Sequence, residues 1–562
     1  MKKLTVTLAL LLCLVLCVFA FSSCGKKKKG GPADTTGEAT AATTSKWPAI
    51  GAEVSAFAAE DRTLKIQYDM SSQNGEKIPT NDKYIKGPDS LNGADSIGEK
   101  IYERNNTAKE LFGLTIEYTY WDEFTWGKQA GKIKEVVDAA DAPDLFIDML
   151  YDLNLAMKTK NVFKDLWSLP GSYYDFTAEG WMKDWMESLS FTGDRAYILG
   201  SDYFIDILRA MGVLPFNMTL MNGKGNDLAP ALFGADNGLS AGETMSARLF
   251  YFVDNGQWTW DALKKLCEAV WADSDGDGQN SYDDVLGIVS DRYTGLPAAL
   301  MVYSSGVSLT ETYQINDEAN EYNGKTWVRY NADSTALGTV FDAVAKVFTG
   351  QGAFVTNYTP DTGKNMSEHY VKFSGNTLLF AGPVILGALE DKAFQQRTID
   401  WSVVPIPKVS ADKKYNTVIH NIADAGAVNV NTTPGKARAL SAFLQYCSEN
   451  SGEIKDEFLQ IVTKHKTAVY DQGTDRMLDL IYSSVITGRD KAFEDVAEGT
   501  NGKSSSSLLK GSQYTGGSDY IVERYQTLLS EKQGRLDAIL KTWYQLPTAS
   551  SEASGTSETP AQ

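Results

Sequence analysis

The sequence predicts an α/β fold, because strand-like and helix-like segments follow one another in turn from residue 64 onward. Residues 64–68 alternate apolar and polar side chains, which is typical of a half-buried strand, and residues 114–120 repeat the pattern. A helical repeat of apolar residues follows each run, and the compact apolar run 145–150 completes the series. A β-α-β-α-β order of this kind forms a parallel sheet with helices on both faces.

Local signals mark the ends of the predicted helices. Ser96 and Glu99 have the spacing of a capping box, which predicts that a helix begins there, and Gly113 predicts its end. Much later, Thr433 followed by Pro434 predicts another helix start, because Thr is a good N-cap and Pro suits the first turn. The α/β pattern therefore recurs late in the chain.

Length and charge limit the class of protein. The chain has 562 residues, and the roughly 500 between its polar ends suit two domains better than one hydrophobic core. The net charge is −19. This negative charge repels the phosphates of nucleic acids. The sequence shows no basic stripe with interleaved aromatic residues that would overcome this repulsion, so we expect no nucleic-acid partner.

Two of the five cysteines are left for the folded body. Cys13 and Cys17 lie in the N-terminal apolar run, and Cys24 follows it. Cys267 and Cys447 lie on the apolar faces of predicted helices, which predicts buried free thiols. A single disulfide between them is the alternative.

The N-terminus has the pattern of an exported protein. Lys2 and Lys3 precede the apolar run 4–21, and together they form a secretory signal. A run of this length also reaches the ~17 residues needed to cross a bilayer, so a retained anchor is the alternative. The Phe-Ser-Ser before Cys24 resembles a bacterial lipobox, although a smaller aliphatic residue is usual where the Phe stands. The resemblance implies a signal peptide over residues 1–23 and a lipid on Cys24.

The segment after Cys24 is predicted to tether the body flexibly to the outer face of the cell membrane. One lipid group holds a protein only marginally. The lysines at 26–29 add to it, since each Lys near an anionic lipid surface is worth about 1 kcal/mol. The linker, residues 24–50, and the tail, residues 548–562, are poor in large apolar side chains and are predicted to be disordered.

The expected ligand site lies at the carboxyl ends of the strands. In open α/β sheets, ligands bind outside this edge, where the connecting loops gather. Ser71 and Asn74 follow the first predicted strand, and Tyr151 and Asp152 follow the third. These four residues are therefore candidate ligand contacts.

A carboxylate-rich loop has the spacing of a calcium site. Aspartates alternate before Gly278, as in the twelve-residue loops of EF-hand or dockerin type, which surround Ca²⁺ with six to eight oxygens. Position twelve is Asp284 where EF-hands use Glu, and residues 285–289 predict a strand instead of a helix. A structural Ca²⁺ site is one interpretation, and a solvated turn is the other. The predicted ligands are Asp273, Asp275, Asp277, the Gln279 carbonyl and Asp284.

Several segments resemble, in the right order, landmarks of the extracellular solute-binding family that includes maltose-binding protein. The longest is residues 255–263 (NGQWTWDAL), which lead through Cys267 into the carboxylate-rich loop. The resemblance covers most of the chain from about residue 60 to 545. Its other segments are residues 194–200, 214–221, 378–383, 401–408, 470–471 and 477–481.

The resemblance implies a two-lobed, periplasmic-binding-protein-like fold of type II, with a hinge between the lobes and a ligand cleft at their interface. It places lobe one at residues 55–210 and 378–460, and lobe two at residues 211–377 and 461–546. It also implies that the ligand stabilises the closed state, which the permease subunits of an ABC importer in the membrane recognise.

The residue types near the expected cleft favour a carbohydrate ligand. Sugars present apolar ring faces and many hydroxyls, so their sites combine aromatic rings with Asp, Asn, Gln and Ser. Peptides use similar contacts, and the preference for an oligosaccharide comes mainly from the family resemblance. The candidate ligand contacts are Ser71, Asn74, Trp121, Tyr151, Asp152, Asp202, Tyr203 and Tyr303.

We predict that the protein is not an enzyme. None of its three histidines stands in a metal-binding spacing. Residues 238–242 match G-x-S-x-G, but they lie in a loop-like stretch, whereas a nucleophile elbow needs a strand before the Ser. Two alternatives remain: a surface glycan-active hydrolase, which needs only two facing carboxylates, and a ligand sensor for a membrane kinase.

Overall fold

The computed structural model describes residues 45–544 with several gaps. The predicted signal peptide, Cys24, most of the linker and the C-terminal tail lie outside the described residues. Within the described ranges, no helix combines the length and the apolar character needed to span a bilayer. The gaps are residues 70–71, 74–75, 78–81, 122–126, 159–160, 292–294, 334, 357–367, 397, 465–471, 486–487 and 499–517.

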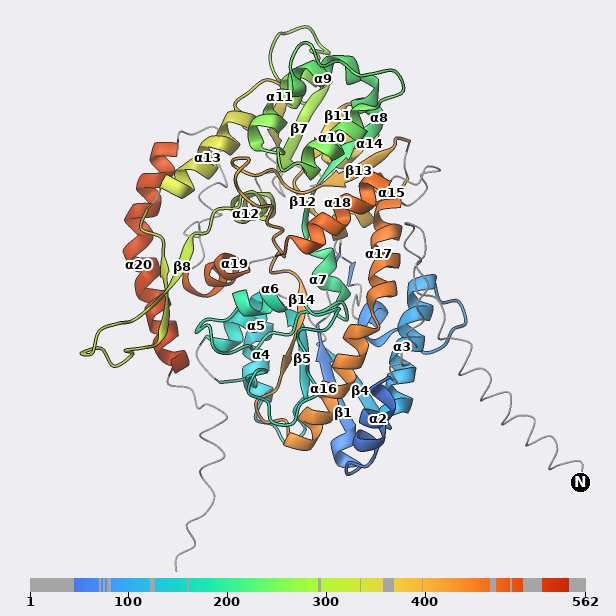
Figure 1. Cartoon of the computed structure of the whole chain (residues 1–562), viewed down its shortest axis with the longest axis vertical. Coiled ribbons are helices and arrows are strands. Elements are labelled where there is room, and N and C mark those ends of the chain that lie inside the picture. Colours follow the sequence, from blue (N-terminus) through green and yellow to red (C-terminus); the bar gives the residue numbers. More distant parts are fainter. Residues whose placement is uncertain are drawn as a thin grey trace, which may run out of the picture. The chain divides into compact units, whose positions relative to one another are not determined.

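The first sheet confirms the predicted β-α-β-α-β order (Figure 1). Its four strands are ordered β14-β5-β1-β4, with β4 and β5 parallel to β1 and β14 antiparallel to β5. Its strands and connecting helices are β1 (Thr63–Tyr68), α3 (Ser96–Phe112), β4 (Thr115–Tyr120), α4 (Gln129–Val136), β5 (Leu145–Met149) and β14 (Asp424–Val428).

The helix signals hold with one correction. The cap of α3 is Asp95, whose side chain accepts a hydrogen bond from the Gly98 N–H (2.8 Å), so the predicted capping box at Ser96 is wrong. The Ser96 hydroxyl instead donates to the Glu457 carboxylate (2.7 Å). Gly113 ends α3 with φ 62°, and Thr433 caps α16 (Pro434–Glu449), as predicted.

The second sheet is mixed and lies in the middle of the chain. Strands β7, β10 and β11 run parallel to one another, whereas β6 is antiparallel to β11, β12 and β13. Its strands, in the order β10-β7-β11-β6-β12 with β13 beside β6, are β6 (Gly212–Asn217), β7 (Leu286–Asp291), β10 (Ala353–Thr356), β11 (Leu378–Ala381), β12 (Val384–Ile385) and β13 (Trp401–Val404). The chain therefore has two α/β lobes, one around each sheet.

Sheet membership corrects the predicted return to lobe one at residue 378. Strands β11 and β13 hydrogen-bond to β7 and β6, so residues 378–404 belong to the second sheet. The chain returns between β13 and β14, where Met211 and Ile419 form an antiparallel bridge. The outgoing and returning segments are thus bonded to each other where they cross.

His420 lies at this crossing as a neutral side chain. Its backbone N–H donates to the Ala210 carbonyl (2.9 Å), and its ring Nδ1 accepts from the Ile422 N–H (3.3 Å). Burial, with a smaller effect of the Lys491 charge, lowers the pKa of His420 to about 3. The returning segment is therefore held by backbone bonds around an uncharged ring.

The late helices add further links between the lobes. Helix α17 (Gly452–Lys464) packs on α3 of lobe one, whereas α18 (Gln472–Ser483) packs on β13 of lobe two. Helix α19 (Arg489–Phe493) and the π-helix η5 (Glu494–Glu498) then contact α5 (Leu150–Met157), which follows β5. Lobe two was predicted to hold all of residues 461–546, and these contacts with α5 differ from that prediction.

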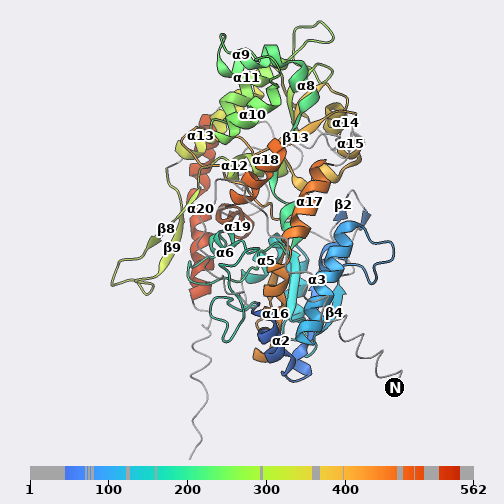
Figure 2. The same cartoon turned by 45° about the vertical axis from the view of Figure 1, so that its right-hand side comes forward.

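The C-terminal helix α20 (Ser518–Tyr544) runs beside α13 (Thr335–Phe348) and the hairpin of β8 (Thr310–Gln314) and β9 (Thr326–Tyr330) (Figures 1 and 2). Its end enters the core around the first sheet. Trp543 is 2% exposed. Its ring centroid lies 4.7 Å from that of Phe191 and 4.7 Å from that of Tyr197. The last described turn of the chain thus completes the core of lobe one.

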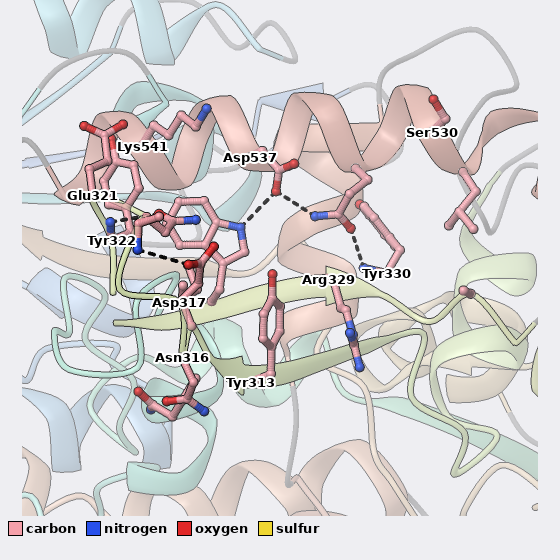
Figure 3. Close-up of a pocket in the computed structure, with 18 of the residues that line it drawn as sticks. Tyr313, Asn316, Asp317, Glu321, Tyr322, Arg329, Tyr330, Ser530, Asp537 and Lys541 are labelled. Carbon is pink, nitrogen blue, oxygen red and sulfur yellow. Dashed lines mark hydrogen bonds between the residues drawn. The ribbon is translucent and has the colours of Figure 1, made fainter. Parts of the chain in front are cut away.

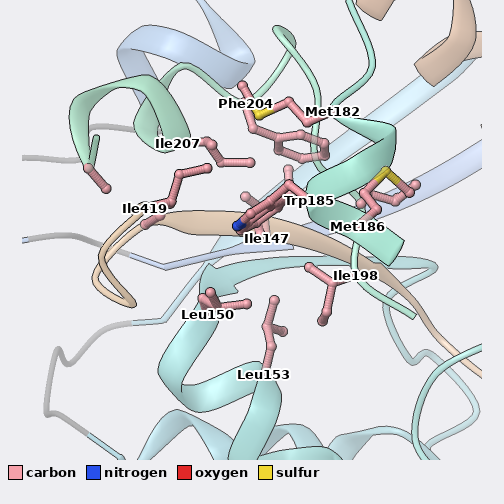
Figure 4. Packing of buried hydrophobic residues seen from close by; sticks show 14 of the residues in the cluster. Ile147, Leu150, Leu153, Met182, Trp185, Met186, Ile198, Phe204, Ile207 and Ile419 are labelled. Atoms are coloured by element: carbon pink, nitrogen blue, oxygen red, sulfur yellow. The ribbon is translucent and has the colours of Figure 1, made fainter. Parts of the chain in front are cut away.

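Trp185 lies at the centre of the core on that side (Figure 4). It packs with apolar side chains from β5, α5, α7 (Ile205–Arg209) and the returning segment, among them Ile147, Leu150 and Ile419. A Cβ at Gly200 would lie 2.5 Å from the indole ring, so only Gly fits there. Elsewhere in the core, Cys267 and Cys447 are free and buried, which confirms that prediction.

Candidate functional site

Three side chains meet where the strands of the first sheet end. Asp69 and Trp121 extend the ladder beyond the strands, through bonds from Asp69 N–H to the Ile147 carbonyl (2.9 Å) and from Trp121 N–H to the Tyr68 carbonyl (3.2 Å). The indole Nε1–H of Trp121 donates to a carboxylate oxygen of Asp148 (2.9 Å). We call Asp69, Trp121 and Asp148 the edge cluster.

The carboxylates of the edge cluster are buried below a partly exposed ring. Asp69 has no exposed surface and Asp148 is 1% exposed, whereas Trp121 is half-buried. Desolvation raises the pKa of Asp148 well above its usual range, and the charges of Asp69 and Asp152 act in the same direction. Of the edge cluster, Trp121 is the residue that keeps exposed surface.

The sequence prediction included Trp121 but missed the two aspartates. Asp69 directly follows the alternating run 64–68, so its position at the strand end was an available signal. Asp148 stands inside the apolar run 145–150, where a lone acidic residue is costly to bury. That cost could have identified it.

Of the two residues predicted after the third strand, Asp152 has a structural role. Its carboxylate accepts hydrogen bonds from the N–H groups of Gly127 (3.2 Å) and Ala130 (2.8 Å), which holds the start of α4, and it has no exposed surface. In this structure the carboxylate has no surface left for a ligand, and its predicted ligand contact stays a prediction. Tyr151 is half-buried, and its N–H donates to the Asn421 carbonyl (3.1 Å), which ties this end of β5 to the returning segment.

Asp202 and Tyr203 also serve the structure. Asp202 accepts a hydrogen bond from the Tyr482 hydroxyl (2.7 Å) and pairs with Lys455 (3.1 Å), so it joins α17 and α18 to the first lobe. The ring of Tyr203 lies under the Arg104 guanidinium, 4.7 Å from its carbon. Neither side chain has exposed surface. Both side chains are committed to protein partners in this structure, and their ligand contacts stay predictions.

The remaining candidates are placed as follows. Tyr303 ends α12 (Leu296–Tyr303) inside the core of lobe two and is 3% exposed, so its contact with a ligand stays a prediction. Ser71 and Asn74 lie outside the described residues. Trp121 and Tyr151 are thus the predicted contacts that keep accessible ring surface at the edge of the first sheet.

The carboxylate-rich loop lies between α11 (Trp260–Val270) and β7. An antiparallel bridge between Ala272 and Val285 closes it. Asp273 accepts from the N–H groups of Gly276 (2.6 Å) and Gly278 (2.8 Å), which curls the loop. Oxygens of Asp273, Asp275 and Asp277 come within 4.8 Å of one another. Three of the predicted calcium ligands therefore converge.

Asp284 and Asn280 stabilise the loop differently from an EF-hand. Asp284 is fully buried, and its two oxygens accept from the N–H groups of Ser274 (2.8 Å) and Ser281 (2.9 Å), which lowers its pKa. Asn280 bonds the backbone of Gly350 and Gly352 (both 2.9 Å). The carboxylate oxygens of the three converging aspartates could therefore hold a cation, whereas Asp284 holds the loop closed through its hydrogen bonds.

The match to a nucleophile elbow does not form one. Ser240 lies in the loop between α9 (Gly225–Phe233) and α10 (Met245–Asp254), with no strand before it. Its N–H donates to the Glu243 carboxylate (3.0 Å). This agrees with the loop predicted at residues 238–242.

Comparison with solved structures finds solute-binding proteins. The GacH receptor of Streptomyces glaucescens, described with acarbose, is 13% identical, with a TM-score of 0.46 over 84% of this chain and 98% of that one. The cyclic alpha-maltosyl-1,6-maltose binding protein of Arthrobacter globiformis is 11% identical, with a TM-score of 0.45 over 85% and 99%.

A family 1 extracellular solute-binding protein of Bifidobacterium longum subsp. infantis is 12% identical, with a TM-score of 0.43 over 86% of this chain and 99% of that one. No protein-family model matches the sequence, and no curated protein matches it. The assignment of two α/β lobes rests on the sheet topology described above.

Proposed function

We propose that this protein is the extracytoplasmic substrate-binding component of an ABC importer and that it captures a carbohydrate between its two lobes. The edge cluster carries the proposal. It stands at the carboxyl ends of the parallel strands β1, β4 and β5, where α/β folds bind ligands, and Tyr151 beside it is bonded to the returning segment. A ligand at this edge is therefore close to the segments that join the lobes.

The chemistry of the edge cluster supports a sugar. The half-buried Trp121 ring offers an apolar face for the C–H side of a pyranose, and its hydrogen bond to the buried Asp148 holds the ring in place. A ligand that contacts both lobes would favour the closed state, which permease subunits recognise, by its differential affinity for that state. Binding and release leave the solute unchanged.

A titration tests the proposal. The full chain would be titrated with a panel of neutral oligosaccharides while tryptophan fluorescence is followed, and the sugar would be recovered afterwards and analysed. We expect a saturable change with at least one sugar and its recovery intact. A flat response from a folded chain across a broad panel contradicts the proposal, and release of shorter products indicates a hydrolase instead.

We also propose that Cys24 carries the lipid that holds the protein at the outer face of the membrane. In the producing cell, Cys24→Ser is expected to abolish incorporation of labelled palmitate and to shift the protein out of the lipid-modified membrane fraction. Cys17→Ser is the matched control, since this cysteine lies in the predicted signal peptide and should leave labelling unchanged. Equal labelling of Cys24→Ser and wild type would contradict the anchor.

We further propose that the converging aspartates bind a structural Ca²⁺. Millimolar Ca²⁺ is expected to raise the melting temperature, because a ligand at 100 times its Kd stabilises the folded state by about 2.7 kcal/mol. Asp275→Asn combined with Asp277→Asn should remove this shift. Asp333→Asn is the control, because Asp333 forms a similar exposed turn with Thr335. The same Ca²⁺ shift in the double variant and wild type would contradict the site.

A further inference from the structure

A groove of about 1060 Å³ lies between the β8–β9 hairpin and α20 (Figure 3). This volume reaches the upper end of the ~300–1,000 Å³ typical of small-molecule sites. Its lining residues come from the hairpin, the loop joining its strands and one face of α20. None of them belongs to the edge cluster, so the groove is a separate feature of the molecule.

The floor of the groove is firmly held. Trp327 is 4% exposed and donates its indole N–H to Asp537 on α20 (2.9 Å). Gln533, one turn earlier on α20, accepts from the Tyr330 N–H (2.8 Å) and donates to the Val328 carbonyl (3.3 Å). The helix thus covers the backbone of β9, which fixes the distance between the two walls of the groove.

Aromatic surface is accessible in this groove. Tyr313 faces Trp327 in the hairpin register and is 36% exposed. Figure 3 shows its ring standing in the groove with its hydroxyl directed toward α20. The Arg329 guanidinium lies 4.8 Å from the centre of that ring and is itself bonded to Glu311 (2.7 Å), so the ring is supported from the side. The half-buried ring of Tyr322 adds to the surface.

The polar groups of the groove favour a neutral ligand. Asn316 and Ser530 are exposed along its margins and provide both hydrogen-bond donors and acceptors. The lining has three carboxylates and two cationic side chains, nearly balanced in charge, and Asp537 and Arg329 are already committed to protein partners. A site for a phosphate or a metal cation needs a strong excess of side chains with the opposite charge. A polyhydroxylated ring matches aromatic faces with neutral donors and acceptors.

We propose that this groove is a second binding site, which takes a neutral oligosaccharide on the ring of Tyr313. It does not depend on the edge cluster being a site. Two positions for one polymer on one molecule would raise the apparent affinity for longer chains by raising the effective concentration of the second contact.

The test uses the full chain with Trp121→Ala, which removes the ring at the sheet edge, and three probes: maltotetraose, cellotetraose and chitotetraose. We expect at least one sugar to protect backbone amides of residues 310–330 and 526–544 from hydrogen exchange. Adding Tyr313→Ala should weaken that binding about tenfold, equivalent to ~1.4 kcal/mol, whereas Tyr313→Trp should retain it. Tyr251→Ala is the matched control, since Tyr251 on α10 is 68% exposed and outside the groove.

Three outcomes would overturn the proposal: no protection of the hairpin and α20 by any of the three sugars, equal affinities with Tyr313 and with alanine, or the same loss from Tyr251→Ala. Protection in the wild type confined to residues 64–69 and 145–151 would support the edge cluster and exclude the groove. Protection confined to the groove would do the reverse. Failure of this proposal and failure of the proposed function are therefore distinguishable.

Discussion

Replacing Trp121 with alanine is expected to weaken binding of the proposed sugar ligand by about 10- to 100-fold, or roughly 1.4 to 2.8 kcal/mol. The indole supplies the accessible apolar face of the edge cluster. Its N–H donates a hydrogen bond to Asp148, which offsets part of the free-energy cost of burying that carboxylate. The variant loses both the stacking surface and the donor that orients the carboxylate. Isothermal titration with a sugar identified in the fluorescence panel would measure the loss.

Tyr120→Ala is the matched control for this variant. Tyr120 directly precedes Trp121 and is 50% exposed, and its ring packs beside Tyr68, at 6.1 Å between centroids. We expect its removal to change the affinity by less than about twofold, well under 1 kcal/mol. If Trp121→Ala and Tyr120→Ala bind the sugar as the wild type does, the ligand does not sit at this edge.

Replacing Arg209 with methionine is expected to lower the free energy of unfolding by about 3–5 kcal/mol, the range for removing one partner of a buried ion pair. Arg209 is 6% exposed. It donates to Asp206 (2.6 Å) and, through two nitrogens, to Glu390 (3.2 and 3.0 Å). Asp206 also accepts from the Asp424 N–H (2.9 Å). Without the guanidinium, the buried Asp206 carboxylate and the partly exposed Glu390 carboxylate lose their cation.

Urea unfolding at pH 7 would measure this loss. Arg209→Lys should fall between methionine and the wild type, because an ammonium keeps the charge but cannot form the two-nitrogen contact with Glu390. Arg535→Met is the control, because Arg535 pairs with Glu531 on the exposed face of α20 and a surface pair is worth at most about 1 kcal/mol. Equal losses for Arg209→Met and Arg535→Met would refute a special role for the buried network.

The sequence predicted the parts of the fold that depend on neighbouring residues. Alternation over 64–68 and 114–120 identified strands correctly, because the side-chain period of a strand is a local property. The cap of α3 was misplaced by one residue, since Asp95 and Ser96 are both good N-cap residues. The return at residue 378 was misplaced because only the pairing of β11 with β7, far apart in the sequence, shows which sheet β11 joins.

The candidate site was harder to predict because residue type does not reveal burial. Asp202 and Tyr203 have the residue types of sugar contacts. The Asp202 carboxylate, however, accepts a hydrogen bond from the hydroxyl of Tyr482, which is 280 residues away along the chain. Trp121 was included for its residue type, because aromatic rings near the cleft loops can stack on sugars. Its partner Asp148 is a lone acidic residue in the apolar run 145–150, but only the pairing of β1 with β4 and β5 places it near Trp121.

The position of Trp543 has a consequence for how the protein is made. Residues 191 and 197, whose rings hold it, leave the ribosome long before the helix that carries it. The sheet of the first lobe also includes β14, which is translated late. Neither the sheet nor the core of this lobe can therefore be complete until the end of synthesis is near. Domains that emerge early generally fold first, yet here the earliest lobe is the one that must wait. A nascent chain arranged in this way cannot complete lobe one until almost all of it has been translated.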